Sequence, residues 1–428
     1  MKKSALLLVI LVVATTALVS CGNASTAGSK PPSNLTQRVL ASQSVSSATA
    51  SGGLVVIDGQ YDTLGRGEIS AGTSPGLMAI SADRATLLAF DSSTNKVEVV
   101  NTIKETLTGS IQLPGSTMSM VVPQPGAGYA AVPSAPLTGT SPGALVAMNL
   151  TSGGITATIG VPNAQTVVSN PSGTELLVFS NDSDSVTVVS PALLNTASPV
   201  TLTVPLCTGC RPVNAVFSSD GSTAYVLNCG AECGGTQASV QIVDMTTTPP
   251  TPGASVPVDG ATIAFLSGST LYVAGNSLTN SACTGETTAA TTCGRLDLVN
   301  LNSMTVTSSA VITDGYHDRI DMGNGGQLFI GSMNCTNIGN VNNVAGEVRG
   351  CLSIYNTTNG SVVIPPDNGD VTGLQSFNSR YVEYVAEGGN LRVYDLFTDA
   401  LLPPNQYIET GTIIITGYIT DVKAIDFF

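Results

Sequence analysis

The sequence predicts an all-β protein, a β-propeller of four-stranded antiparallel blades. Short apolar segments rich in Val, Ile, Leu and Tyr recur along the chain, and Gly, Asn, Asp, Ser or Pro separate them, which is typical of strands and turns. These segments recur in groups about every 42 to 56 residues, which is near the period of a propeller blade. After residue 37 no stretch shows sustained helical periodicity.

Each repeat holds three short apolar runs, and a fourth usually follows, as at Gly109–Leu113 and Ile155–Val161. The clearest copies are Pro75–Asn101, Ala164–Ser190 and Arg211–Asn228, the last continued by Ala238–Asp244. Weaker copies are Thr117–Ser134, Ala261–Ser277, His317–Ser332 and Val371–Leu396. The expected innermost strands lie near residues 76, 117, 164, 213, 261, 319, 371 and 421, which gives eight blades. Seven blades stay an alternative if one weak copy is not a blade.

The two ends of the chain predict how the ring closes. The segment Thr420–Phe428 has the pattern of an innermost strand with nothing after it. Arg38–Gln43 and Leu54–Asp58 have the pattern of a second and a third strand. We therefore expect both ends to share one blade, because this pairing removes two exposed sheet edges.

The best copies also carry a motif. Ser219-Asp220-Gly221 and Ala224-Tyr225-Val226 lie within Arg211–Asp244, and Pro75–Val100 and Leu54–Asp58 match in part. The pattern resembles the YVTN family of surface-layer and exported propeller proteins, over nearly the whole chain after the leader. The resemblance implies the fold more securely than any activity.

The N-terminus has the features of an export signal. Lys2 and Lys3 precede an apolar run from Ala5 to Leu18, which is too short for a comfortable bilayer span. The run ends in Leu18-Val19-Ser20-Cys21, which resembles the lipobox of bacterial lipoproteins. That resemblance implies a signal peptide over residues 1–20 and lipid attachment at Cys21. The alternative is an ordinary secretory signal with a chance cysteine.

The organisation expected after the signal is a lipidated, flexible tether over residues 21–37 and a propeller domain over residues 38–428. The tether is small and polar, so it cannot bury enough surface to order itself. Gly22, rather than Asp, follows the cysteine, and by the family's sorting rules this favours the outer membrane over the inner membrane. We expect an extracytoplasmic, lipid-anchored protein of the cell envelope.

The net charge of the chain limits the classes of partner that it can bind. Only 10% of residues are charged, and loss of Lys2 and Lys3 with the signal lowers the formal net charge from −14 to −16. This acidic balance argues against nucleic acid and against electrostatic binding to anionic lipid. The expected partners are the membrane, through the lipid, and a protein or a glycan.

The cysteines predict disulfides. Besides Cys21 there are eight, an even number, which in an exported protein indicates disulfide bonds. The sequence-local pairs are favoured, although the first four cysteines could pair crosswise. These pairs are Cys207 with Cys210, Cys229 with Cys233, Cys283 with Cys293, and Cys335 with Cys351.

All eight cysteines are expected on one face of the propeller. With strands a to d counted outward, this face carries the b–c loops and the connections from d to the next a. It also carries the long loops Asn276–Cys293, Ser332–Gly350 and Pro133–Gly143. Long loops on a rigid scaffold often bind partners, so this face is the predicted binding surface. The alternative is that the disulfides only prevent fraying and proteolysis.

Candidate chemistry is sparse. His317, the single histidine, lies with Asp314, Asp318 and Asp321 at the start of an expected inner strand, where the four could form a polar cluster at the channel mouth. A single histidine is more often a polar strand-end residue than a catalytic one. The sequence predicts no catalytic residue, no metal site and no cofactor. The absence of tryptophan removes the docking residues that quinone-cofactor propellers use.

The function predicted from these features is a membrane-anchored scaffold that binds a partner. One alternative is a lactonase-like propeller hydrolase. Such sites usually gather Glu, Asp, Asn and His around the channel, and here that set is thin. Another alternative is a structural spacer in a surface assembly.

Overall fold

The structure is a computed structural model, and the statements below concern the residues that it describes. These are residues 31–45, 52–137, 141–194, 201–278, 293–335, 350–366, 369–377, 379–404, 408 and 411–426. The predicted signal peptide and Cys21 lie outside them, as does most of the predicted tether. Within this part of the chain, no helix is both long enough and apolar enough to cross a bilayer.

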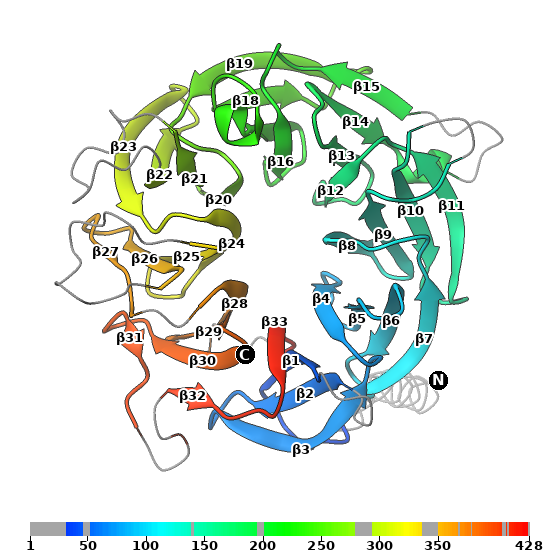
Figure 1. Cartoon of the computed structure of the whole chain (residues 1–428), viewed down its shortest axis with the longest axis vertical. Helices are drawn as coiled ribbons and strands as arrows, with labels where there is room; N and C mark the ends of the chain where they lie inside the picture. Colours follow the sequence, from blue (N-terminus) through cyan, green and yellow to red (C-terminus); the bar gives the residue numbers. More distant parts are fainter. Residues whose placement is uncertain are drawn as a thin grey trace, which may run out of the picture.

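The described strands form eight antiparallel sheets arranged in a ring, an eight-bladed β-propeller (Figure 1). This confirms the predicted fold class and decides the blade number against seven. Strands are given below from the centre outward, and blades are numbered in chain order.

The first four blades are regular four-stranded sheets. Blade 1 consists of β33 (Tyr418–Ala424), β1 (Arg38–Ser44), β2 (Gly53–Asp58) and β3 (Thr63–Ser70). Blade 2 consists of β4 (Pro75–Ile80), β5 (Thr86–Asp91), β6 (Lys96–Asn101) and β7 (Thr106–Gln112). Blade 3 consists of β8 (Ser119–Gln124), β9 (Ala127–Val132), β10 (Ala144–Asn149) and β11 (Gly154–Gly160). Blade 4 consists of β12 (Ala164–Ser169), β13 (Leu176–Ser180), β14 (Ser185–Val189) and β15 (Thr201–Pro205).

The remaining blades include the degenerate repeats. Blade 5 consists of β16 (Pro212–Phe217), β17 (Thr223–Asn228), β18 (Ser239–Asp244) and β19 (Thr251–Pro257). Blade 6 consists of β20 (Ile263–Ser267), β21 (Thr270–Ser277), β22 (Cys293–Asn300) and β23 (Thr305–Ile312). Blade 7 consists of β24 (Tyr316–Met322), β25 (Gln327–Met333), β26 (Leu352–Asn356) and β27 (Val362–Val363). Blade 8 consists of β28 (Val371–Phe377), β29 (Val382–Glu387), β30 (Asn390–Asp395) and β31 (Ala400–Leu401), and β32 (Thr412–Ile413) also pairs with β30.

The ring closes through both ends of the chain, as predicted. The C-terminal strand β33 is the innermost strand of blade 1 and pairs antiparallel with β1, with Val39 opposite Ala424 and Ala41 opposite Val422. Figure 1 shows the red β33 beside the blue β1 and β2. The two ends of the chain thus complete one four-stranded sheet, and the ring is closed through blade 1.

The apolar core lies between neighbouring blades. Leu88 and Val99 of blade 2, for example, belong to one buried cluster with Ala130 and Val146 of blade 3. The middle strands are buried on both faces, which explains why they read as near-continuous apolar runs. Outer strands bury fewer residues: in β7 only Ile111 is buried.

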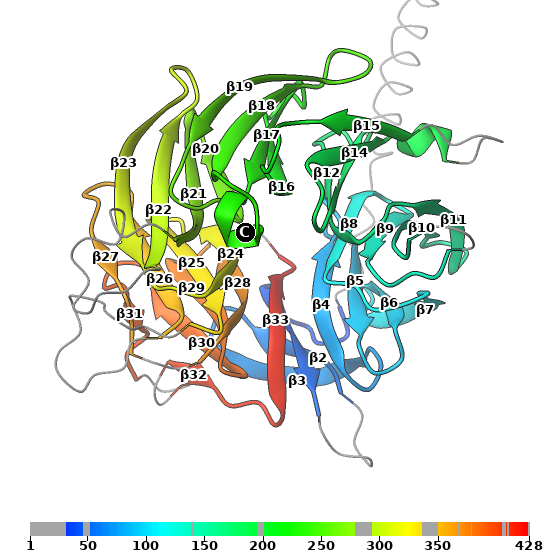
Figure 2. The same cartoon turned by 45° about the horizontal axis from the view of Figure 1, so that its top comes forward.

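The strand order gives the propeller two distinct ends. We call the end with the b–c loops and d-to-a connections the cysteine face. We call the opposite end, with the a–b and c–d turns, the terminal face, because the described chain begins and ends there. Inner strands such as β33 and β4 run from the cysteine face towards the terminal face, and Figure 2 shows them side by side along the inside of the ring.

Candidate functional site

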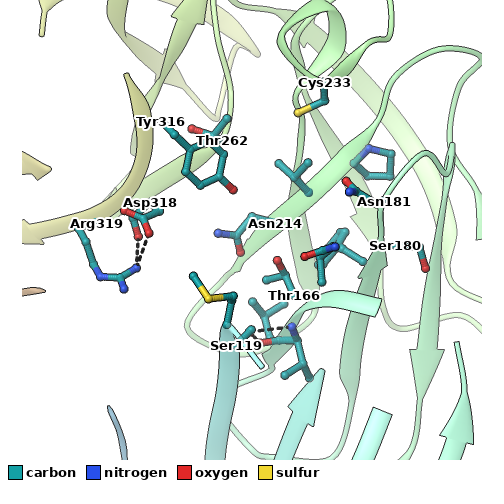
Figure 3. Close-up of a pocket in the computed structure, with 17 residues that line it drawn as sticks. Ser119, Thr166, Ser180, Asn181, Asn214, Cys233, Thr262, Tyr316, Asp318 and Arg319 are labelled. Carbon is teal, nitrogen blue, oxygen red and sulfur yellow. Dashed lines mark hydrogen bonds and ion pairs between the residues drawn. The ribbon is translucent and has the colours of Figure 1, made fainter. Parts of the chain in front are cut away.

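A cavity of about 520 Å³ opens where the inner strands begin, at the cysteine face. Strands of blades 3, 4, 5 and 7 supply its walls. The b–c loop of blade 5 contributes Cys233 (Figure 3). The polar and exposed side chains that line it include Met118, Ser119, Thr166, Asn214, Thr262, Tyr316, Asp318 and Arg319. The opposite end of the channel holds a second cavity, of about 550 Å³, with a mainly apolar lining that includes Met78, Met120 and Phe217.

The cavity is polar because of how the inner strands are exposed. The middle strands of each blade lie between two sheets and carry apolar residues. The inner strands have one edge on the channel, so polar residues such as Ser119, Thr166 and Asn214 are tolerated there. Several polar side chains also bridge inner strands: Ser119 Oγ accepts the Val167 N–H at 3.0 Å.

Asp318, on β24, is the carboxyl group among the described residues that line the cavity. Its Oδ2 pairs with Arg319 Nη1 at 2.9 Å. Its Oδ1 is buried and has no hydrogen-bond partner among the described residues. Burial raises the pKa of Asp318 to about 6, with Asp421 and Asp370 adding to the rise and Arg319 opposing it. A carboxyl group with this pKa can accept or release a proton near neutral pH.

Tyr316 stands beside Asp318 and presents its ring to the cavity (Figure 3). Its side chain is 49% exposed, yet desolvation raises the pKa of the phenol, and the charges of Asp318 and Glu232 raise it further. The phenol therefore stays protonated at neutral pH and can donate a hydrogen bond.

Glu232 fixes the loop that overhangs this cavity. It lies in the short 3₁₀ helix Gly230–Cys233, in the b–c loop of blade 5. Its carboxylate accepts the Asn276 backbone N–H at 2.8 Å and the Asn276 side-chain N–H at 3.0 Å. Asn276 Nδ2 also donates to the Gly315 carbonyl, immediately before Tyr316. The loop is thus tied to blade 6 and to the start of blade 7.

The four residues of the predicted polar cluster do not form one site. Only Asp318 lines the cavity. His317 is fully buried, and its Nε2 lies 2.9 Å from the Thr313 carbonyl oxygen. Burial lowers the pKa of His317 to about 4, so the ring is neutral at pH 7.

The two other acidic residues of that cluster lie apart from the cavity. Asp314 precedes β24, and its backbone oxygen accepts the Ser332 hydroxyl at 2.8 Å. Asp321 lies towards the far end of β24, where its carboxylate accepts the backbone N–H groups of Ser376 at 2.6 Å and Met322 at 2.9 Å. Both therefore have hydrogen-bonding roles within the fold.

The sequence analysis missed Tyr316, Arg319, Asn214 and Thr262. They come from two inner strands, β24 and β16, and one strand-connecting segment, so no single spacing in the chain links all four. The one signal that could have found them is a polar residue near the start of each inner strand. Among the described residues, no three His, Cys, Asp or Glu side chains are placed to hold a metal ion.

The predicted disulfides are confirmed for the described cysteines. Cys207 bonds Cys210, Cys229 bonds Cys233, and Cys335 bonds Cys351. Cys293 is disulfide-bonded as well, and Cys283, the partner expected for it, lies outside the described residues. Six of the described cysteines lie in b–c loops or d-to-a connections, and Cys293 is the first residue of β22 after such a loop, so all of them lie at the cysteine face. Such bonds persist in an oxidising compartment outside the cytoplasm.

The loops that carry the first four cysteines are neighbours. The Gly230 N–H donates to the Cys210 carbonyl at 2.8 Å, and the Cys229 N–H donates to the Arg211 carbonyl at 2.9 Å. Asp184, from blade 4, accepts the Gly209 N–H at 2.7 Å and the Arg211 N–H at 3.3 Å. These hydrogen bonds and the charge of Arg211 lower the pKa of Asp184, and desolvation opposes them. Asp184 therefore connects blade 4 to the loop that carries the Cys207–Cys210 disulfide, just before β16 of blade 5.

No family model matches the chain, and no curated protein matches it in sequence. Several solved structures match its fold. The periplasmic gluconolactonase PpgL of Pseudomonas aeruginosa is 13% identical, with a TM-score of 0.53, over 91% of this chain and 99% of that one. A putative 6-phosphogluconolactonase of Bacteroides fragilis is 14% identical, with a TM-score of 0.53, over 91% and 98%. Dihydro-heme d1 dehydrogenase NirN, in complex with DHE, is 11% identical, with a TM-score of 0.60, over 93% and 79%. At such identities the likeness shows the β-propeller fold alone.

Proposed function

We propose that this chain is a lipid-anchored, extracytoplasmic binding protein whose cavity on the cysteine face takes a hydroxyl-rich ligand such as a glycan end. The observation that carries the proposal is the Asp318 carboxyl group in the wall of a polar cavity, of which only Oδ2 has a partner among the described residues. A partly desolvated carboxylate with spare acceptor capacity gains a hydrogen bond when a ligand hydroxyl donates to it.

The rest of the cavity suits the same ligand class. Arg319 and the protonated Tyr316 are donors, while Asn214 is both a donor and an acceptor. The half-exposed ring of Tyr316 offers an apolar face against which a sugar ring can pack. A few convergent polar groups on a rigid scaffold are typical of small-molecule sites.

The anchor is supported by the Leu18-Val19-Ser20-Cys21 motif and by the disulfides, which agree with export. Gly22 after the cysteine favours the outer membrane.

The test uses the soluble form that begins at Gly22, with its disulfides intact, on a panel of glycans followed by calorimetric titration of each hit. We expect Asp318→Asn to weaken binding about 10- to 100-fold, the range for a hydrogen bond to a charged group. Asp220→Asn is the matched control, because Asp220 is exposed on an a–b turn of the terminal face. The proposal fails if no glycan binds, or if the two variants bind equally well.

A second candidate function is hydrolysis of a lactone. Two of the fold neighbours carry gluconolactonase names, and Asp318 has a pKa suited to general base catalysis. In such a reaction Asp318 takes a proton from a water that attacks the lactone carbonyl, and Tyr316 or Arg319 faces the oxyanion that forms. Collapse of this intermediate breaks the ring acyl C–O bond, and Asp318 returns the proton to the leaving ring oxygen.

The hydrolase candidate is tested by following the opening of glucono-1,5-lactone above its spontaneous rate. Activity that Asp318→Asn removes and Asp220→Asn leaves unchanged would favour the hydrolase over the binding protein. A rate equal to the spontaneous one for the wild-type chain excludes this substrate.

A further inference from the structure

The described chain enters the propeller on the terminal face. Ser33 is held by Glu105, in the turn between β6 and β7: its backbone N–H donates to Oε2 at 2.8 Å and its hydroxyl donates to Oε1 at 2.6 Å. Turns between third and fourth strands lie on the terminal face by the strand order. A tether that precedes Ser33 therefore starts from this face, at the edge of blade 2.

Large apolar side chains are exposed on turns of the same face. Phe397 is 72% exposed and Tyr381 is 47% exposed, and their ring centroids lie 4.6 Å apart. Tyr61 and Ile103 occupy the c–d turns of blades 1 and 2 and are also exposed. We call Tyr61, Ile103, Tyr381 and Phe397 the aromatic rim.

Two ion-pair clusters link turns that carry the aromatic rim, across blades 8, 1 and 2. Arg380, next to Tyr381, donates to both carboxylate oxygens of Asp62, next to Tyr61, at 2.7 and 2.8 Å. Arg38 of blade 1 donates to the carbonyl of Thr102, next to Ile103, at 2.6 Å. Figure 1 shows these three blades side by side. The turns that carry the aromatic rim are therefore held in fixed positions beside the point where the chain enters.

The length of the tether limits which face can lie on a membrane. Only ten residue steps separate Cys21 from Pro31. As a coil they span about 17 Å on average, and fully extended at most about 35 Å. To put the cysteine face on the bilayer, the tether would have to run the height of a blade, which for the eight residues of β3 is about 26 Å, and then pass the loops. With the terminal face on the bilayer, the tether needs no such extension.

We infer that the terminal face rests on the lipid bilayer, with the aromatic rim in the headgroup region and the cysteine face directed away from the membrane. This inference rests on the proposed lipid at Cys21. Tyr and Phe side chains are favoured at a membrane interface, where one end of the ring is apolar and the surroundings are wet. Lys104, exposed next to Ile103, can reach headgroup phosphates while its stem lies on apolar surface.

The orientation gives the proposed binding cavity its access. The cavity opens on the cysteine face, so it is directed to the compartment and not to the lipid. The described disulfides are on the same face. The net negative charge of the chain means that zwitterionic headgroups fit this contact better than strongly anionic ones.

The test exploits the absence of tryptophan from the chain. A single reporter is placed in the full-length, membrane-processed protein, by Phe397→Trp in one variant and Ile103→Trp in a second. The matched control is Leu278→Trp, because Leu278 is exposed on a b–c loop of the cysteine face. Each protein is reconstituted into phosphatidylcholine vesicles that contain acyl-brominated lipid, and quenching of Trp emission is measured. Mass spectrometry of the N-terminal peptide reports acylation of Cys21.

We expect Phe397→Trp and Ile103→Trp to be quenched by at least half and shifted to the blue, with Leu278→Trp unchanged. Unquenched reporters on an acylated chain overturn the orientation and leave the anchor intact, as does equal quenching of all three. A chain that is not acylated and does not float with the vesicles overturns the anchor and this inference together. The mass spectrum therefore separates the two failures.

Discussion

Arg38 and Asp426 are 388 residues apart in the chain and form a two-point ion pair. Arg38 Nε and Nη2 each lie 2.8 Å from one carboxylate oxygen of Asp426, and the Arg38 backbone N–H donates to the same group at 2.8 Å. Arg38 Nη1 also contacts Glu105 of blade 2 at 3.1 Å. One guanidinium thus joins the first strand, the end of the last strand and the neighbouring blade.

Replacing Arg38 with alanine should therefore open the ring at its closure. The pair is almost buried, and removing one partner of a buried pair leaves an uncompensated charge, at a cost of about 3 to 5 kcal/mol. We expect a lower denaturant midpoint for Arg38→Ala in urea unfolding with the disulfides intact. Arg66→Ala, on the exposed outer strand β3, is the control and should leave the midpoint unchanged. Equal midpoints for both variants would show that the Arg38–Asp426 ion pair does not stabilise the closed ring.

Much of the fold could be predicted because it repeats. Short apolar runs bounded by turn residues, repeated about every 50 residues, are local properties of the chain, and even the degenerate blades 7 and 8 kept recognisable inner strands. Their outer strands β27 and β31 have two residues each, which explains why their fourth runs were hard to find. The closure was predictable because each chain end carried an incomplete blade.

The site could not be predicted to the same degree. Asp318 and Arg319 meet Asn214 only because the ring brings blades 5 and 7 to one channel. Adjacent residues on one strand also point differently: His317 is buried against Thr313, while Asp318 lines the cavity. Grouping acidic residues by closeness in sequence to the single histidine therefore joined positions that the sheet separates.

Glu383 should make the protein less stable as the pH rises. It lies fully buried on β29, neither carboxyl oxygen has a partner when the group is ionised, and burial next to Asp321 raises its pKa well above 4.5. The folded state then holds a proton that the unfolded state releases, so stability falls from about pH 4.5 upward, by at most about 1.4 kcal/mol per pH unit.

The substitution Glu383→Gln removes this dependence while it keeps a donor towards Asp321. We expect the variant to be more stable than the wild-type chain at pH 8 and the difference to shrink towards pH 4.5, in urea unfolding at a series of pH values. The exposed Glu68→Gln serves for comparison and should follow the wild-type curve. Parallel curves for Glu383→Gln and wild type would mean that Glu383 is not the protonated group.

Binding in the proposed site should depend on pH through Asp318. Only the ionised carboxylate accepts hydrogen bonds with both oxygens, and burial raises its pKa to about 6. Affinity for a hydroxyl ligand should therefore fall as the pH drops from 7 to 5, by about tenfold per pH unit below the pKa at most. Calorimetric titration at pH 5, 6 and 7 measures this, and Asp318→Asn should give a flat profile. A steep profile in that variant would place the titrating group elsewhere.

The last prediction concerns Glu232, which lies near the cavity and ties its overhanging loop to Asn276. Its two hydrogen bonds, at 2.8 and 3.0 Å, join blade 5 to blade 6 at the cysteine face. Burial raises the pKa of Glu232, and the two Asn276 bonds counter that rise, so the loop is held by a partly desolvated carboxylate.

Glu232→Ala removes both bonds but not the Cys229–Cys233 disulfide, which closes the loop itself. We expect amide exchange in residues 230–236 to accelerate at least tenfold and ligand affinity to fall, while the urea midpoint changes little because the blade cores are untouched. Glu68→Ala, on the outer strand β3, is the control for the loss of a carboxylate. Unchanged exchange with reduced affinity would instead make Glu232 a direct ligand contact, and a large drop in the midpoint would make it a support of the whole fold.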